Sequence, residues 1–182
     1  MADGTRPRKL DLIDAKILTI LQRDGRITNQ RLSEMVGLSP RPCLERVNRL
    51  EREGFISHYM AIVDPRRVSG QTTFFAEITL RDQTQTAQAA FDKVLRACPE
   101  VIDCYLVSGQ IDYVARVVCP SLDRYRELTA SWIDDPKLPV ARISTAIVLS
   151  PVREFGGYPV TAADGETPDV PSPHPGKRRA AE

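Results

Sequence analysis

The sequence predicts an α+β chain of two small domains, one of three helices and one with the element order β-α-β-β-α-β. Apolar residues recur at helical spacing in three short segments before residue 55, and each segment follows a capping residue. After residue 72, segments rich in β-branched and aromatic residues alternate with two amphipathic segments. A length of 182 residues is sufficient for two such domains.

The N-terminal domain is predicted to contain three short helices. Asp11, Thr28 and Ser39 are the expected N-caps, and Pro40 follows at the first helical position, where proline is well tolerated. Gly37 ends the second helix and makes a tight turn into the third. Two short helices joined in this way form a helix-turn-helix, whose second helix presents its first residues to base edges in the DNA major groove.

The third helix, expected from residue 40 to about 53, separates an apolar stripe from a polar face. Arg41 could bind guanine through two hydrogen bonds, and Glu45 could accept from cytosine N4 or orient an arginine. Arg46 and Arg49 could contact bases or phosphates. As an ordinary solvated face, the helix would instead carry pairs such as Glu45 with Arg49. The apolar stripe consists of Cys43, Val47 and Leu50. The candidate DNA-binding residues are Asn29, Gln30, Ser39, Arg41, Pro42, Glu45, Arg46 and Arg49.

The C-terminal domain is predicted to be a ferredoxin-like sheet with both helices on one face. The expected strands are 73–80, 101–107, 112–118 and 140–149, and the expected helices are 86–97 and 121–134. Because the strands carry apolar residues on both sides, among them Phe75, Val114 and Val118, the uncovered face is expected to pair with a second copy in a dimer. The segment 55–63 alternates as a strand pair or one long strand.

The expected domain boundaries follow from these patterns. The stretch from Gly156 onward holds five of the fourteen prolines and has no apolar period, so we expect a disordered tail. Its Lys177-Arg178-Arg179 triplet is either a solvated end or a contact to DNA phosphates. The divisions are a basic arm at 1–9, a winged helix-turn-helix at 10–58, a linker strand at 59–72, the sheet domain at 73–155 and the tail at 156–182.

Composition limits the classes of function. The 25 basic and 24 acidic side chains argue against a uniformly basic protein that coats nucleic acid. No apolar run is long enough to span a membrane, so a cytoplasmic protein without a membrane partner is expected. Four cysteines without a C-x-x-C pair and only two histidines argue against a zinc site. We therefore expect no metal, no other cofactor and no catalytic residues, and the protein is not expected to be an enzyme.

The motifs of both domains closely resemble the Lrp/AsnC (leucine-responsive, feast/famine) transcription regulators. In the first domain the matching runs are Leu10-Asp11-x-x-Asp14-x-x-Ile17-Leu18, Asp24-Gly25-Arg26-Ile27, Val36-Gly37-Leu38-Ser39-Pro40-x-Pro42-Cys43-Leu44-Glu45-Arg46-Val47 and Leu50-Glu51-x-x-Gly54-Phe55-Ile56. In the second, the match is Val107-Ser108-Gly109-x-x-Asp112-Tyr113. The resemblance implies a winged helix-turn-helix, a ligand-sensing domain of the RAM/AsnC type, homodimers that assemble further, for example into octamers, and an amino acid effector.

The resemblance also implies an effector site at the turn between the second and third strands of the sheet domain. Gly109 would let a ligand approach the backbone, and Asp112 would bind the ligand ammonium or fix the loop. Gln110 departs from the acidic residue common in the family, and Arg41 replaces a smaller residue. From the residues alone, the same turn could be an ordinary hairpin. The candidate effector-binding residues are Ser108, Gly109, Gln110, Asp112 and Tyr113.

The leading prediction is a sequence-specific DNA-binding transcriptional regulator whose oligomeric state or DNA binding responds to a small effector. The expected effector is an amino acid. Residues 1–58 carry 11 basic and 8 acidic side chains, whereas 73–150 carry 8 and 10. This modest basic excess favours binding through several domains of an oligomer. Two alternatives are an amino-acid-sensing module that acts through protein partners and an enzyme on a dimeric ferredoxin-like fold.

Overall fold

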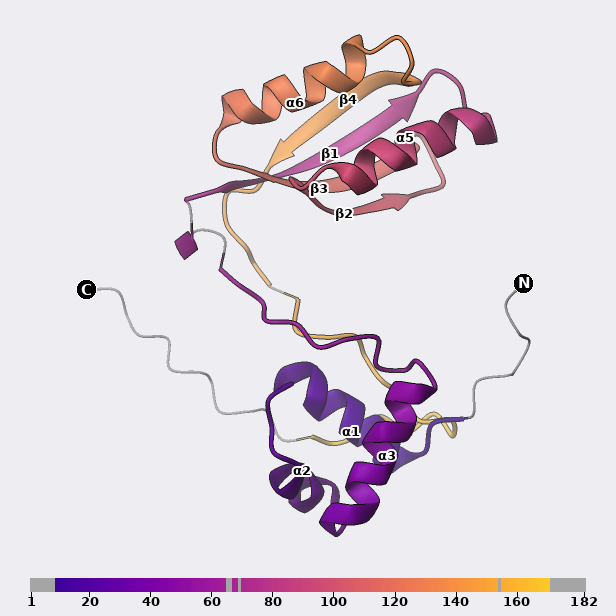
Figure 1. Ribbon diagram of the computed structural model, residues 1–182, viewed down its shortest axis with the longest axis vertical. Helices are drawn as coiled ribbons and strands as arrows, with labels where there is room; N and C mark the ends of the chain where they lie inside the picture. The colour runs from indigo at the N-terminus through magenta and orange to yellow at the C-terminus, as the bar shows by residue number, and fades with distance from the viewer. Residues whose placement is uncertain (1–8, 65–66, 69, 154, 171–182) are drawn as a thin grey trace. The chain divides into compact units, whose positions relative to one another are not determined.

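The computed structural model describes residues 9–64, 67–68, 70–153 and 155–170. The chain divides into two units (Figure 1). Residues 62–152 form the C-terminal unit, and the segments on either side of them together form the N-terminal unit. Most of the basic arm and the Lys177-Arg178-Arg179 triplet lie outside the described residues. Within the described ranges, none of the helices has the length and apolar character that crossing a membrane requires.

The N-terminal unit contains the three predicted helices. They are α1 (Leu12–Arg23), α2 (Asn29–Val36) and α3 (Pro40–Arg52). The predicted caps precede them, and Asp11 accepts a hydrogen bond from the Asp14 N–H at 2.8 Å. Ser39 also stands at its cap position, although its hydroxyl makes no capping bond. Gly37 has a φ of +73°, which lets the chain turn sharply between α2 and α3. The helix-turn-helix is therefore confirmed.

Apolar side chains from all three helices meet in one small core. Cys43 and Leu50 of α3 are fully buried beside Ile17 of α1, and Val47 packs at the edge, as the predicted apolar stripe requires. The segment 55–64 forms no strand, so the predicted strand pair or single long strand is wrong for the single chain. The predicted linker strand is wrong as well, because none of the described residues from 59 to 71 lies in a strand. Alternating apolar residues show only which side chains share a face, and a strand also needs a hydrogen-bonding neighbour.

The C-terminal unit is the predicted ferredoxin-like domain. Its four antiparallel strands lie in the order β2-β3-β1-β4, with α5 and α6 packed against the sheet (Figure 1). The elements are β1 (Thr72–Leu80), α5 (Gln85–Ala97), β2 (Val101–Leu106), β3 (Tyr113–Cys119), α6 (Leu122–Asp134) and β4 (Val140–Ile147). Each lies within about two residues of its predicted range.

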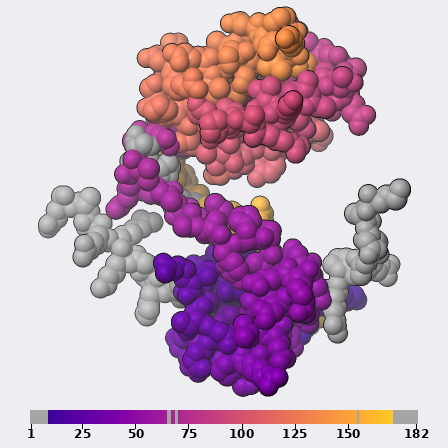
Figure 2. All heavy atoms as spheres, viewed as in Figure 1, coloured from indigo at the N-terminus to yellow at the C-terminus, as the bar shows by residue number. Residues whose placement is uncertain are grey.

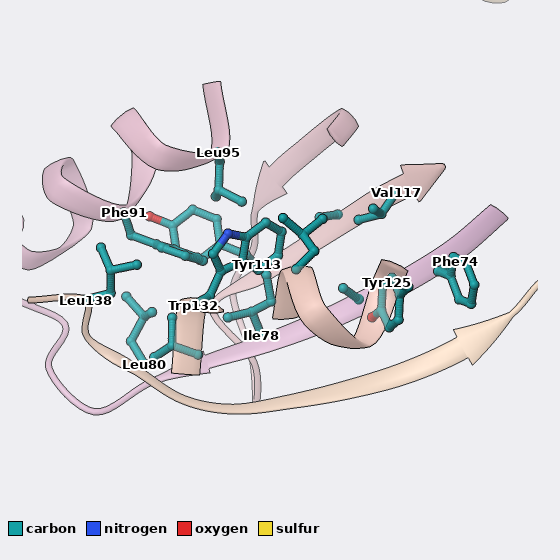
Figure 3. Close-up of a cluster of buried hydrophobic side chains, with 14 of the residues drawn as sticks. Phe74, Ile78, Leu80, Phe91, Leu95, Tyr113, Val117, Tyr125, Trp132 and Leu138 are labelled. Carbon is teal, nitrogen blue, oxygen red and sulfur yellow. The ribbon is translucent and has the colours of Figure 1, made fainter. Parts of the chain in front are cut away.

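Aromatic residues hold the helices of this unit on the sheet (Figure 3). The ring of Phe74 on β1 stacks on Tyr125 of α6 with centroids 4.1 Å apart. Phe91 of α5 meets Tyr113 and Trp132 edge-on at 5.5 and 5.9 Å. Such pairs contribute about 0.5–1.5 kcal/mol each beyond the burial of their area. They join α5, α6 and the sheet into one core.

The uncovered sheet face is more polar than the sequence pattern suggests. Phe75 is 39% exposed there, and Val114 and Val118 are half-buried. The strand register places charged residues among them, including Arg116, which pairs with Asp103 at 2.5 Å. The expectation of a bare apolar face is thus only partly met, because polar residues at every second position of neighbouring strands fall on the same side.

Residues 157–170 contribute to the N-terminal unit, where the sequence pattern indicates a disordered tail. Val160 and Val170 pack on the core of α1, α2 and α3, and Ala162 is only 5% exposed. We call this segment the C-terminal hook. Isolated small apolar residues can fill a surface groove without any repeating pattern, which is why periodicity does not detect them.

Replacing Phe91 with alanine should destabilise the C-terminal unit by about 3–5 kcal/mol, because the large buried ring leaves a cavity. Leu122→Ala is the control. Leu122 is 44% exposed, so its loss should cost less than about 1 kcal/mol. Urea denaturation of the full chain, followed by the fluorescence of its single tryptophan in α6, measures both. Equal costs would contradict this description of the core.

Candidate DNA-binding and effector sites

The solvent-facing side of α3 carries a continuous polar stripe. Arg41, Glu45, Asn48 and Arg52 are exposed and follow one another at helical spacing, opposite the buried Cys43. In the space-filling view, the atoms of α3 form a large part of the visible surface of the N-terminal unit (Figure 2). Arg41 and Glu45 form an exposed ion pair at 3.3 Å, which fits the alternative in which Glu45 orients an arginine. Asn48 and Arg52 were outside the candidate set.

The residues near the turn before α3 have different roles. Asn29 donates from Nδ2 to the Pro40 carbonyl oxygen at 2.8 Å and so ties the start of α2 to the start of α3. Gln30 is exposed and donates to Glu34 at 3.1 Å. Ser39 and Pro42 are exposed at the first turn of α3. Pro40 and Pro42 have no N–H and the Cys43 N–H is bonded to the Ser39 oxygen, so within this turn the Arg41 N–H is the backbone donor left for an anion such as a phosphate.

Arg46 and Arg49 point from α3 to α1. The Arg46 guanidinium Nη1 lies 2.6 Å from Asp11 Oδ2 and 2.8 Å from Asp14 Oδ1, and Arg49 Nη2 lies 2.5 Å from Asp14 Oδ2. Asp14 is only 2% exposed. The structure therefore places both arginines in an ion-pair network within the protein, whereas the sequence suggested that they face DNA.

The network perturbs the ionisation of its outer members. Burial alone would raise the pKa of Asp11, but the Asp14 N–H and the Arg46 guanidinium lower it below its usual value. The hydrogen bond to Asp11, opposed by burial, raises the pKa of Arg46. Asp11 and Arg46 are accordingly both charged across the physiological pH range.

Asp14 is the site residue that pattern reasoning missed. It lies on the buried side of α1 next to Ile17, where a carboxylate is unfavourable unless cations neutralise it. An acidic residue on the apolar side of a predicted helix is the sequence feature that could have identified Asp14. Such a residue needs basic partners within the fold, and Arg46 and Arg49 of α3 are those partners.

Two of the five candidate effector residues turn into the fold. Asp112 is 8% exposed and accepts hydrogen bonds from the Leu80 N–H at 2.7 Å and from Gln83 Nε2 at 2.8 Å. Tyr113 donates from Oη to Asp92 at 2.9 Å, and burial together with this carboxylate raises the pKa of the phenol. These hydrogen bonds anchor the residues that follow the β2–β3 turn to β1 and α5.

The other three candidates lie on the surface of that turn. Ser108, Gly109 and Gln110 are exposed, and a Cβ on Gly109 would meet nothing within 4 Å. The turn thus offers open backbone and two polar side chains. The five residues are neighbours in space, but only three present groups to solvent.

The described residues show no group of three or more histidine, cysteine or acidic side chains placed to share a metal ion. Among the cysteines, the thiol of Cys104 has the most perturbed pKa. Burial, and to a smaller extent the nearby carboxylates of Asp92 and Asp103, raises this pKa to about 11. This thiol is protonated at neutral pH and is a poor nucleophile.

Comparison with known proteins agrees with both units. Residues 10–57 match the winged helix-turn-helix DNA-binding model, and residues 73–157 match the Lrp/AsnC ligand binding domain. The leucine-responsive regulatory proteins of Serratia marcescens and Escherichia coli are each 42% identical, over 85% and 82% of this chain and 94% and 91% of their own.

Solved structures show the same architecture. An AsnC family transcriptional regulator from Agrobacterium tumefaciens has a TM-score of 0.76 and 31% identity, over 82% of this chain and 97% of its own. A transcriptional regulator from Neisseria meningitidis in complex with L-Met has a TM-score of 0.73 and 31% identity, over 80% and 93%. With its helix-turn-helix and ligand-binding domain, this chain belongs to the Lrp/AsnC family of transcriptional regulators.

Proposed function

We infer that α3 is the DNA recognition helix and that Arg41, Glu45 and Asn48 contact bases. The observation that carries this proposal is the exposed polar stripe on a helix whose opposite side is buried and whose start is fixed by Asn29. A helix presented in this way can enter the major groove with its polar face toward the base edges. Ser39, Pro42 and the first-turn backbone would lie along the phosphates, with Gln30 of α2 nearby.

In this proposal Arg46 and Arg49 hold α3 at a fixed angle to α1 and do not read bases. Their guanidinium groups share the Asp14 carboxylate, and their side chains are only 27% and 23% exposed. Since a recognition helix must be held rigidly to discriminate between bases, these arginines are positioning residues.

The regulator is proposed to act as a homodimer, and as larger assemblies such as octamers, with the open sheet face as an interface. Phe75 and Val118 lie on that face. Arg116 Nε and Thr79 Oγ1, also on it, are buried without a hydrogen-bond partner among the described residues. A second copy could cover the apolar groups and pair the polar ones. Several DNA-binding units would then compensate for the small basic excess of each.

The effector is proposed to be an amino acid bound at the turn of Ser108, Gly109 and Gln110. The open backbone and the two exposed polar side chains suit a small zwitterion, and Asp112 and Tyr113 keep the turn in place. The related Neisseria regulator binds L-Met. An effector can change DNA binding only by binding one state of the protein more tightly than another.

Combining Arg41→Ala with Asn48→Ala should weaken binding to a DNA site selected from random sequence. Each lost base contact costs about 1–3 kcal/mol, or roughly 5- to 150-fold. Arg126→Ala, which removes an exposed arginine from α6, is the charge-matched control and should change affinity little. Fluorescence anisotropy at constant salt measures both. An equal loss in the control would show that net charge, not α3, determines the affinity.

Replacing Asp14 with asparagine should destabilise the N-terminal unit by about 2–4 kcal/mol, because two guanidinium groups lose the carboxylate between them. Asp11→Asn is the matched control. The Asp11 side chain is 51% exposed, so its loss should cost about 1 kcal/mol or less. Hydrogen exchange of α1 and α3 in the full chain reports on this unit directly. Similar exchange in both variants would contradict the central role of Asp14.

A thermal-shift screen of the amino acids should identify the effector, since a ligand at 100 times its Kd stabilises by about 2.7 kcal/mol. Gln110→Ala should reduce that shift without lowering the melting temperature of the free protein, because Gln110 is exposed. Asp112→Ala should lower the melting temperature even without ligand, since the Leu80 N–H loses its acceptor. A full shift in the Gln110 variant would place the effector elsewhere.

A further inference from the structure

The C-terminal hook runs the length of α1 and back. Both backbone groups of Tyr158 bond to Gln22 near the end of that helix. The Ala163 N–H donates to the Leu10 carbonyl oxygen, just before the helix begins, at 2.9 Å. Val170 then accepts from Arg23 Nη1 at 3.4 Å. The three contact points show that the hook reverses direction beside the first turn of α1.

The reversal is a tight turn with its own hydrogen bonds. The Gly165 N–H donates to the Ala162 oxygen at 3.0 Å, and the Ala162 N–H donates to the Glu166 oxygen at 2.9 Å. Asp164 accepts from the Glu166 N–H at 3.0 Å. The turn thus has a defined shape that does not depend on regular secondary structure.

Gln22 binds both backbone groups of Tyr158 at the start of the hook. Its Oε1 accepts from the Tyr158 N–H at 2.6 Å, and its Nε2 donates to the Tyr158 oxygen at 3.1 Å. The chain approaches so closely that a Cβ on Gly157 would lie 2.9 Å from Gln22 Oε1, and Gly157 has a φ of +105°. Only glycine fits this position without strain.

Apolar contacts complete the binding surface. Ala162 is 5% exposed, Pro168 is buried, and Val160 and Val170 pack on the core shared by the three helices. Apart from Gly157, its first residue, the hook follows the region of the family match, which ends at residue 157. The surface beside α1 is therefore covered by a segment that lies almost entirely outside both matched domains.

The hook is connected to the recognition helix through the start of α1. Leu10, which bonds to Ala163, immediately precedes Asp11, the N-cap of α1 and the partner of Arg46. Asp14, one turn further, binds Arg46 and Arg49 of α3. Fixing the backbone at Leu10 therefore restrains the two carboxylates that hold α3.

We propose that the surface beside α1 binds the chain's own residues 157–170, and that the bound hook positions α3 through Leu10, Asp11 and Asp14. The expected effect on DNA affinity rests on the proposed function of α3, whereas the binding of the hook to α1 does not depend on that function. Binding of the hook and its effect on DNA affinity are therefore measured separately.

Two glycine variants of the full chain test the proposal. Gly157→Ala adds a methyl group against Gln22 at a positive φ, whereas Gly156→Ala adds the same group where nothing lies within 4 Å. Without DNA, hydrogen exchange in residues 10–23 should be roughly tenfold faster in the first variant and unchanged in the second. Equal exchange in both variants would contradict the proposed binding of the hook to α1.

A chain ending at residue 156 lacks the hook and gives a second test, in which the missing segment is supplied as a separate peptide. Adding a synthetic peptide of residues 156–170 should restore slow exchange in α1, and the same peptide with Gly157→Ala should not. A chain ending at residue 170 should match the full chain. Failure of the unaltered peptide to bind or to change the exchange of α1 would contradict specific recognition of this segment by the surface beside α1.

DNA affinity tests the positioning role separately. Gly157→Ala should weaken binding to the selected DNA site by roughly three- to tenfold, and Gly156→Ala should leave it unchanged. Faster exchange in α1 with unaltered DNA affinity would contradict the proposal that the hook positions α3. The same result would still support the binding of the hook to α1. Absence of specific DNA binding in the unaltered chain, with the exchange result as expected, would refute the proposed function alone.

Discussion

The carboxylate of Asp14 is the constraint on which the DNA-binding unit depends. It is almost fully buried, and a buried charge is tolerated only when charges of opposite sign surround it. Arg46 and Arg49 provide them, and both lie on α3. An ion pair of this kind contributes little net stability compared with apolar packing, but it admits few alternative arrangements. The geometry of α3 relative to α1 is thereby specified more narrowly than the small apolar core would specify it.

Local patterns in the sequence predict the helices and strands well because each pattern acts over a few residues. The caps Asp11 and Thr28 and the turn at Gly37 are where the sequence places them. The role of Arg46 and Arg49 depends instead on a residue more than thirty positions away, as the separation of 32 between Arg46 and Asp14 shows. An outward position on a helical wheel cannot distinguish solvent from a neighbouring helix.

The same distinction applies to the C-terminal unit and to the hook. Asp112 is identifiable as a polar residue in a turn, but its use as an acceptor for Leu80 depends on strand pairing. The hook has neither period nor regular structure, and its contacts are made by backbone groups and by small side chains such as Ala162. Composition classifies such a segment as disordered, because composition does not show that another part of the chain offers a surface to which the segment can bind.

The discontinuity of the N-terminal unit has a consequence for biosynthesis. Domains generally fold in the order in which the ribosome makes them. Here α1 and α3 emerge first, but the hook that completes their unit is made only after the entire sheet domain. At usual translation rates this delay is on the order of ten seconds. The C-terminal unit can therefore fold while the N-terminal unit is still incomplete. A nascent or prematurely terminated chain would then contain a folded ligand-binding domain before it contains a complete DNA-binding unit.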